Sequence, residues 1–159
     1  MAKVRMGMVG GGEGAFIGGI HRMAAAMDGE IELVCGAFSG DPERSARSGA
    51  MLYLEPERIY GDYRQMMSAE AALPADQRMQ FVAIVTPNDL HFPVAEAALG
   101  AGFHVLSDKP ATLSLAQALQ LRERVRDSGL LYGLTHTYTG YPLVKEARER
   151  ISRGELGKI

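Results

Sequence analysis

The sequence predicts an α/β fold: a doubly wound, mostly parallel sheet with helices on both faces. Apolar runs typical of strands alternate with helical patterns along nearly all of the 159 residues, and this alternation favours a parallel sheet. Some of these runs are apolar throughout rather than at every second position, which is typical of parallel strands covered on both faces. The sequence has no internal repeat and no low-complexity tract.

The first half of the chain contains three expected strands. Residues 3–9 read as a strand that runs into a glycine-rich turn. A helix then follows from apolar residues spaced three and four apart, namely Ile17, Ile20, Ala24 and Met27. Residues 31–38 read as a second strand, followed by a turn and a helix start. A short third strand is expected near 59–60, and Asp62 is suited to cap the next helix.

The second half of the chain continues the alternation. Residues 79–86 are the strongest strand prediction, and the helix after them should end at Gly100 or Gly102. Ser114 is a natural N-cap, with Gln117 placed for a capping box. The remaining expected elements are a strand at 103–107, a helix end at Gly129, a strand at 130–138 and a helix after Pro142.

Composition and charge exclude several classes of protein. Apolar residues make up 47% of the chain and charged residues 23%, so a packed domain is expected rather than disorder. A net charge of −2 gives no electrostatic reason to expect nucleic acid or an anionic membrane as a partner. Cys35 is the single cysteine, which excludes an intramolecular disulfide and a Cys-rich zinc site. Neither a secretory signal nor a membrane span is recognisable, so we expect a cytoplasmic setting. No metal site is expected.

The glycine-rich segment VGGGEGAFIGGIHR, residues 9–22, is the first candidate site. It contains G-x-G-x-x-A between a strand and a helix, where missing side chains let a pyrophosphate approach the backbone and the helix amides. A flexible terminal loop is the alternative. The sequence therefore predicts a dinucleotide-binding turn whose candidate contacts are Gly10, Gly12, Gly14, Ala15, Phe16 and Ile17.

The end of the second strand bears on the choice of cofactor. An acidic residue there usually binds the ribose hydroxyls of the dinucleotide. In this chain Ser39 stands at that position, Asp41 lies two residues further in a turn that also fits a helix start, and Arg44 is close by. The absence of an acid favours tolerance of a 2′-phosphate, but backbone contacts to the ribose fit equally well. NAD and NADP both stay open as cofactors.

Two further motifs follow predicted strands, at the sheet edge that forms the ligand crevice of open α/β folds. TPNDLH, residues 86–91, contributes Thr86, Pro87, Asn88 and His91 as candidate cofactor contacts. SDKP, residues 107–110, would direct Lys109 towards the same edge. An ordinary exposed lysine is the alternative for Lys109.

The stretch VTPNDLHFPVAEAALGAGFHVLSDKP closely resembles the signature region of the Gfo/Idh/MocA oxidoreductases, the group of glucose–fructose oxidoreductase and inositol dehydrogenase. DPERS, YGDYRQMM and GELGKI support the resemblance, which covers essentially the whole chain in the same order. It implies a Rossmann-type domain and a nicotinamide cofactor bound across 10–17, the end of the second strand and 86–91. It also implies that Lys109 matches the family's E-K-P lysine, which contacts substrate and nicotinamide and is the candidate catalytic residue.

The function implied by the resemblance is hydride transfer between nicotinamide and a secondary alcohol of a sugar, cyclitol or polyol. The expected partners are this small-molecule substrate and, in a full-length form, further copies of the chain. Residues 1–140 would form the cofactor domain, and 141–159 would begin the crossover into a substrate domain that carries the proton acceptor. On this reading the chain alone binds cofactor without turnover. The alternative is a stand-alone nucleotide-binding or sensor module.

The sequence departs from the family pattern at several places. Asp108 replaces the usual Glu before Lys109, the glycine turn is longer than the common form, and HTYTGYP lacks the arginine often found before its proline. Neither His21 nor His91 is a convincing base, His104 reads as structural, and His136 stays undecided.

Overall fold

The computed structural model describes residues 2–158; Met1 and Ile159, the outer ends of the two predicted domains, lie outside the described residues. Five parallel strands form one sheet in the order β2-β1-β3-β4-β5. Their bounds are β1 Val4–Gly10, β2 Ile31–Ala37, β3 Phe81–Val85, β4 His104–Ser107 and β5 Tyr132–Leu134. The structure confirms the predicted α/β class.

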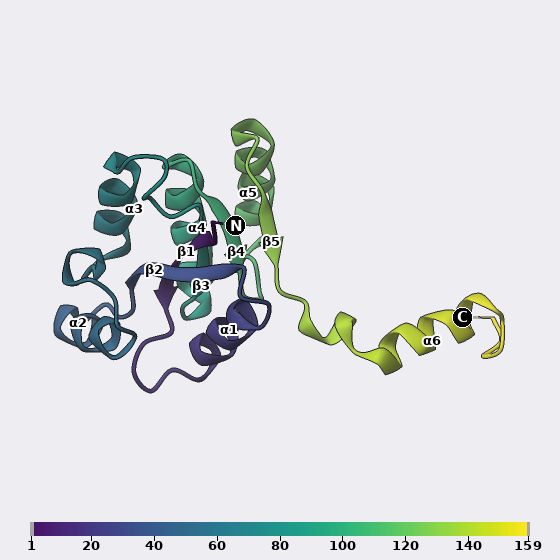
Figure 1. The fold of residues 1–159 in the computed structure, drawn as a ribbon. Helices are drawn as coiled ribbons and strands as arrows, with labels where there is room; N and C mark the ends of the chain where they lie inside the picture. Colours follow the sequence, from purple (N-terminus) through teal and green to yellow (C-terminus); the bar gives the residue numbers. More distant parts are fainter. Residues whose placement is uncertain (1, 159) are drawn as a thin grey trace.

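Helices cover both faces of the sheet (Figure 1). They are α1 Phe16–Ala26, α2 Pro42–Met51, α3 Tyr63–Ala72, α4 His91–Gly100 and α5 Leu115–Ser128, whereas α6 Pro142–Ser152 lies away from the sheet (Figure 1). Successive β1 residues enter two different cores: Met8 packs in the cluster that includes Ile17 of α1, and Val9 packs in the cluster that includes Val94 of α4. Strands buried on both sides explain the continuous apolar runs of the sequence.

The predicted helix caps are present. Asp62 Oδ1 accepts from the Arg64 amide at 2.8 Å and the Gln65 amide at 3.2 Å, and it begins α3. Ser114 Oγ accepts from the Gln117 amide at 3.2 Å. The Gln117 side chain accepts from the Leu113 amide at 3.0 Å rather than from the cap's own amide, so the capping box is offset by one residue.

Two strand predictions differ from the structure. The segment at 59–60 forms only a single parallel bridge, between Gly36 and Ile59, because a 3-10 turn at Pro56–Arg58 precedes it and α3 follows almost at once. The last strand spans only three of the nine residues expected, since Thr137–Gly140 turns into a 3-10 helix. The sheet therefore ends in the short strand β5 at one edge, and at the other edge β2 carries a single bridge beyond it.

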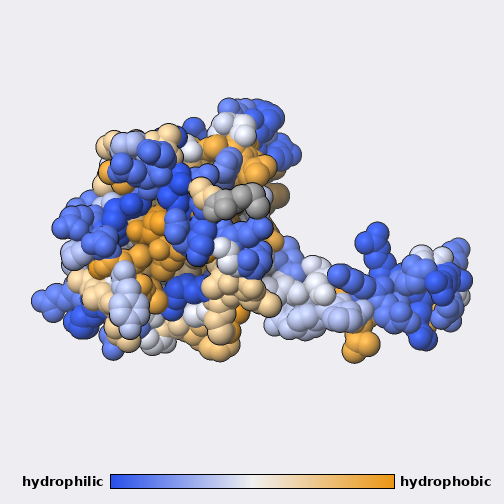
Figure 2. Space-filling view, viewed as in Figure 1, coloured by the Kyte–Doolittle hydropathy of each residue, from blue (hydrophilic) through white to orange (hydrophobic). Residues whose placement is uncertain are grey.

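The C-terminal segment projects from the body as an arm that contains α6 (Figure 1). Residues 141–158 are exposed throughout, and the arm is mainly hydrophilic on the face shown in Figure 2. Within residues 2–158, no helix has the length and apolar character needed to cross a membrane.

Candidate functional site

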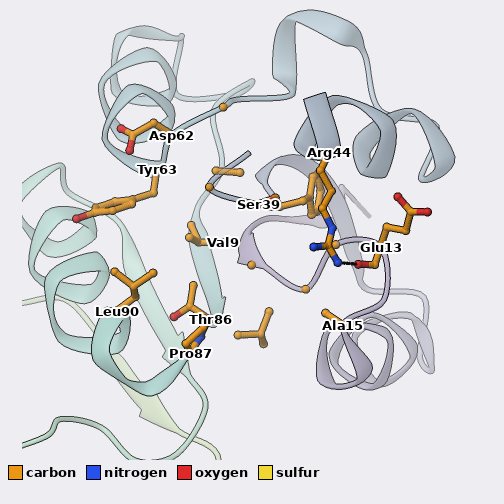
Figure 3. A pocket seen from close by; sticks show the side chains of 18 residues that line it. Val9, Glu13, Ala15, Ser39, Arg44, Asp62, Tyr63, Thr86, Pro87 and Leu90 are labelled. Atoms are coloured by element: carbon orange, nitrogen blue, oxygen red, sulfur yellow. Dashed lines mark hydrogen bonds between the residues drawn. The ribbon is translucent and has the colours of Figure 1, made fainter. Parts of the chain in front are cut away.

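A cavity of about 580 Å³ lies at the carboxyl ends of β1, β2 and β3 (Figure 3). Its volume falls in the range of small-molecule sites. It also lies at the topological switch point of the sheet, because the chain passes from β1 to β2 on one side and to β3 on the other. The lining residues are Val9, Gly10, Gly11, Gly12, Glu13, Ala15, Ala37, Phe38, Ser39, Gly40, Arg44, Gly61, Asp62, Tyr63, Val85, Thr86, Pro87 and Leu90.

The glycine turn requires glycine for two different reasons. Gly10 and Gly11 have positive φ values of 82° and 71°, which side chains other than glycine rarely adopt. At Gly12, an added Cβ would lie 2.7 Å from the Ser48 hydroxyl and 2.9 Å from the Phe38 carbonyl. The turn is therefore built from backbone conformation and close packing together, and its backbone is exposed to the cavity.

Helix α2 anchors the tip of this long turn. The Glu13 amide donates to Ser48 Oγ at 3.0 Å, and the Arg44 guanidinium donates to the Glu13 carbonyl (Figure 3). The Glu13 carboxylate lies 3.7 Å from the Arg47 guanidinium, with both side chains more than half exposed. These contacts fix the extra residues of the turn. Sequence reasoning missed them, although Arg44 and Ser48 lie one helical turn apart on the same face of α2.

The N-terminus of α1 faces the cavity without a cap of its own. Ala15 occupies the N-cap position, makes no side-chain hydrogen bond, and no acidic residue lies in the first turn. The first amides of a helix have no partner within the helix. Such a terminus attracts an anion through these amides and the positive end of the helix dipole.

The wall at Gly61–Tyr63 is a part of the cavity that sequence reasoning missed. A signal was present, because a segment that pairs in parallel with β2 must end at the same sheet edge. Buried Glu70 fixes the base of this wall. Its carboxylate accepts from Arg58 twice, both at 2.7 Å, and from the Tyr60 hydroxyl at 3.0 Å. Burial, reinforced by the Glu70 charge, raises the pKa of Tyr60.

The end of β2 presents Ser39 and Arg44 to the cavity. Ser39 Oγ accepts from the Asp41 amide at 3.1 Å. Asp41 is the N-cap of α2 and accepts from the Glu43 amide at 3.0 Å. Asp41 therefore serves as a helix cap. Ser39, which stands where an acidic residue is usual, is part of the cavity wall.

Lys109 is exposed on the turn that follows β4, outside the cavity lining. Asp108 Oδ1 accepts from the Lys109 amide at 2.8 Å and from the Thr135 hydroxyl at 2.9 Å. The Asp108 amide donates to the Ile84 carbonyl at 2.9 Å. Asp108 thus ties the lysine's turn to the end of β3 through its amide and to Thr135, just after β5, through its carboxylate.

The predicted site residues fall into two groups. Those that line the cavity are Gly10, Gly12, Ala15, Ser39, Arg44, Thr86 and Pro87; those outside its lining are Gly14, Phe16, Ile17, Asn88, His91 and Lys109. Phe16 is 82% exposed on α1, whereas Ile17 packs into the core beneath it. His91 is only 1% exposed. In residues 2–158 no three His, Cys, Asp or Glu side chains are grouped to hold a metal ion.

The fold and the site define a dinucleotide-binding α/β domain. The chain belongs to the Gfo/Idh/MocA oxidoreductase family with an NAD-binding Rossmann fold, which matches residues 4–136. The resemblance carried by TPNDLH and SDKP is therefore confirmed at the level of the family.

Known relatives extend beyond the region covered by this chain. "Uncharacterized oxidoreductase YfiI" of Bacillus subtilis is 33% identical over 98% of this chain and 39% of its own length. Levoglucosan dehydrogenase of Pseudarthrobacter phenanthrenivorans is 27% identical over 100% of this chain and 40% of its own length. An inositol dehydrogenase homolog from Azotobacter vinelandii, complexed with NADH and myo-inositol, superimposes with a TM-score of 0.92 at 43% identity, over 99% of this chain and 41% of that one. The chain thus spans about two fifths of the length of these relatives.

Proposed function

We propose that this chain is the cofactor-binding part of an NAD(P)-dependent dehydrogenase that oxidises a secondary alcohol of a sugar, cyclitol or polyol, or reduces the matching ketone. The observation that carries the proposal is the cavity at the switch point of the sheet, over the uncapped start of α1. Family membership and the carbohydrate- and inositol-related relatives support the class of reaction.

The donor set of the cavity fits a dinucleotide. The open amides at the start of α1 and the glycine turn would hold the pyrophosphate. Ser39 and Arg44 would lie towards the adenosine ribose, while Val9, Val85 and Leu90 give the cavity apolar walls for the rings. When bound, the nicotinamide supplies the hydride acceptor or donor.

Lys109 is the proposed catalytic residue. Its turn follows β4, and β4 pairs with β3, whose own end carries the cavity residue Thr86. An ammonium group at this edge would donate a hydrogen bond to the reacting oxygen and stabilise the negative charge that develops there. It would also assist movement of the hydroxyl proton.

The arm at residues 141–158 is proposed to lead into a substrate domain. Its exposed Leu143, Val144 and Ile151 would pack against that domain. On this proposal the 159-residue chain binds cofactor without turnover, and the full-length enzyme is a cytoplasmic homo-oligomer.

The experiment is a titration of the chain with NADH and with NADPH, followed by nicotinamide fluorescence. Ala15→Asp is the matched variant. Its carboxylate would cap α1, adding about 0.5–2 kcal/mol of stability, while repelling the pyrophosphate. We expect saturable binding to the unmodified chain, and binding at least about tenfold weaker, or 1.4 kcal/mol, in the more stable variant. Absence of saturable binding for both nucleotides would overturn the assignment.

A further inference from the structure

One buried imidazole connects the two turns that flank the proposed reaction site. His91 begins α4 and is 1% exposed. Its Nδ1 lies 2.6 Å from the Pro110 carbonyl oxygen, and its Nε2 lies 3.0 Å from the Thr86 carbonyl oxygen. Pro110 directly follows Lys109, whereas Thr86 lines the cavity. A single ring therefore spans from the cavity wall to the backbone beside the lysine.

The chemistry of the two partners restricts what the ring can do. Backbone carbonyl oxygens only accept hydrogen bonds, so each contact requires an N–H from the ring. A ring with one N–H would satisfy one carbonyl and set a nitrogen lone pair against the other at hydrogen-bonding distance. In either neutral tautomer the ring therefore hydrogen-bonds one of the two turns and packs against the other.

The surroundings show what this ring adds to the strands and to the Asp108 carboxylate, which accepts from the Lys109 amide, in holding the turn of the lysine. The ladder between β3 and β4 ends at Ile84 and Ser107, and the Asp108 amide adds one more bond to the Ile84 carbonyl. Beyond that point the Lys109 side chain is exposed. The His91 bridge to Pro110 restrains the turn on the far side of Lys109, after the ladder has ended.

We propose that His91 is a positioning residue for Lys109: its buried ring, held between the Pro110 and Thr86 carbonyls, keeps the Lys109–Pro110 turn at a fixed place beside the cavity turn at Thr86. His91 itself contacts neither cofactor nor substrate. This inference rests on the proposed function for its importance to the reaction, but its structural content can be tested without cofactor.

The first measurement uses the unmodified chain, labelled with ¹⁵N in its four histidines. His91→Gln identifies the His91 signals by their loss. We expect a His91 ring N–H signal that exchanges slowly with water, because the ring is buried and lies within hydrogen-bonding distance of a backbone carbonyl on each side. A His91 ring whose N–H exchanges as fast as that of an exposed histidine would overturn the proposal, and this result does not depend on any variant that folds poorly.

The second measurement reads the position of Lys109. Reductive ¹³C-methylation labels the four lysines Lys3, Lys109, Lys145 and Lys158, and Lys109→Arg assigns the key signal. In His91→Phe and His91→Gln we expect the Lys109 signal to move while the other three stay in place. His104→Gln is the matched control, since the His104 ring accepts from the Leu131 amide at 3.0 Å at the start of the neighbouring strand. An unmoved Lys109 signal in a folded His91 variant would overturn the proposal.

Addition of NADH separates this inference from the proposed function. If the dinucleotide binds, the Lys109 signal of the unmodified chain should shift when NADH is added. In His91→Gln this shift should differ, while the dissociation constant for NADH changes less than about threefold, or 0.7 kcal/mol. Loss of NADH binding by the unmodified chain would instead contradict the proposed function, and the two ligand-free measurements would still decide the role of His91.

Discussion

Gly18 in α1 lies in backbone contact with Gly11 in the glycine turn. A Cβ at position 18 would lie 2.4 Å from the Gly11 Cα and 2.6 Å from its carbonyl oxygen. Neither atom belongs to a flexible side chain that can move aside. Close packing of helix and strand is the role of the third glycine in a dinucleotide-binding turn. In this longer turn Gly18 fills that role, three residues beyond the predicted Ala15.

Gly18→Ala is therefore expected to lower the free energy of unfolding by about 1–3 kcal/mol through overpacking, although alanine is the better helix former. Gly19→Ala is the matched control, because its Cβ would meet nothing closer than the Arg22 guanidinium at 4.0 Å. That variant should gain up to about 1 kcal/mol. Urea unfolding of both variants measures the difference, and a gain in both would contradict the packing argument.

Ser48 is expected to hold the glycine turn in its binding conformation. Its hydroxyl accepts from the Glu13 amide at 3.0 Å and donates to the Arg44 carbonyl at 2.7 Å. Ser48→Ala removes the hydrogen bond to the Glu13 amide and should lower the free energy of unfolding by about 1 kcal/mol. If the same amount is lost from the order of the turn, NADH binding weakens about fivefold. Ser68→Ala, at an exposed position on α3, should change neither quantity. Equal NADH affinity in all three chains would exclude the anchoring role.

Glu70 is expected to support both the stability of the domain and the cavity wall. It is fully buried and pairs with Arg58 at 2.7 Å. Glu70→Gln leaves the partly buried guanidinium without its counter-charge, so we expect a loss of about 2–4 kcal/mol in unfolding free energy. The same change at Glu149, which pairs with Arg153 at 2.8 Å on the exposed α6, should cost less than about 0.5 kcal/mol. Thermal melts compare the two, and similar losses would contradict the burial argument.

Local patterns were sufficient to predict most of the helices and strands and one edge of the site. The periodicity of α1, the cap at Asp62 and the left-handed Gly129 at the end of α5 are all encoded within a few residues. The placement of TPNDLH and SDKP followed from a general rule, because both motifs come directly after strands of a parallel sheet.

Contacts between distant segments were not predictable in the same way. Glu13 and Ser48 are 35 residues apart, and no pattern within either segment predicts that they form a hydrogen bond. His91 was predicted to lie near the crevice from its position in a motif, and its ring is buried against the carbonyl of Pro110, 19 residues away, a contact that the motif alone does not indicate. The predicted third strand failed because turns on both sides of Ile59 leave one bridge only.

His21 is expected to make stability depend on pH. Burial on α1 lowers the pKa of this histidine below its ordinary value of 6.5, and the nearby Asp108 carboxylate partly opposes the shift. The unfolded chain therefore binds the proton more readily than the folded one. The contribution of His21 to the free energy of unfolding is fully present above pH 6.5. It is lost progressively as the pH falls below that value and through the lower pKa of the folded chain. His21→Gln should flatten this fall relative to the unmodified chain in urea titrations at pH 8, 6.5 and 5.5; parallel curves would contradict it.

Ser39 is expected to decide between NAD and NADP. It stands at the end of β2 in the cavity wall, with Arg44 beside it. Ser39→Asp adds a carboxylate that would accept from the ribose hydroxyls of NADH and repel the 2′-phosphate of NADPH. We expect the ratio of NADPH to NADH affinity to fall at least about tenfold, or 1.4 kcal/mol. Ser39→Asn has the same size without the charge, so it should change the ratio far less. Equal ratios of NADPH to NADH affinity in the two variants would show that charge at position 39 does not govern the choice of cofactor. That choice would then be set by Arg44 and the backbone of residues 39–40.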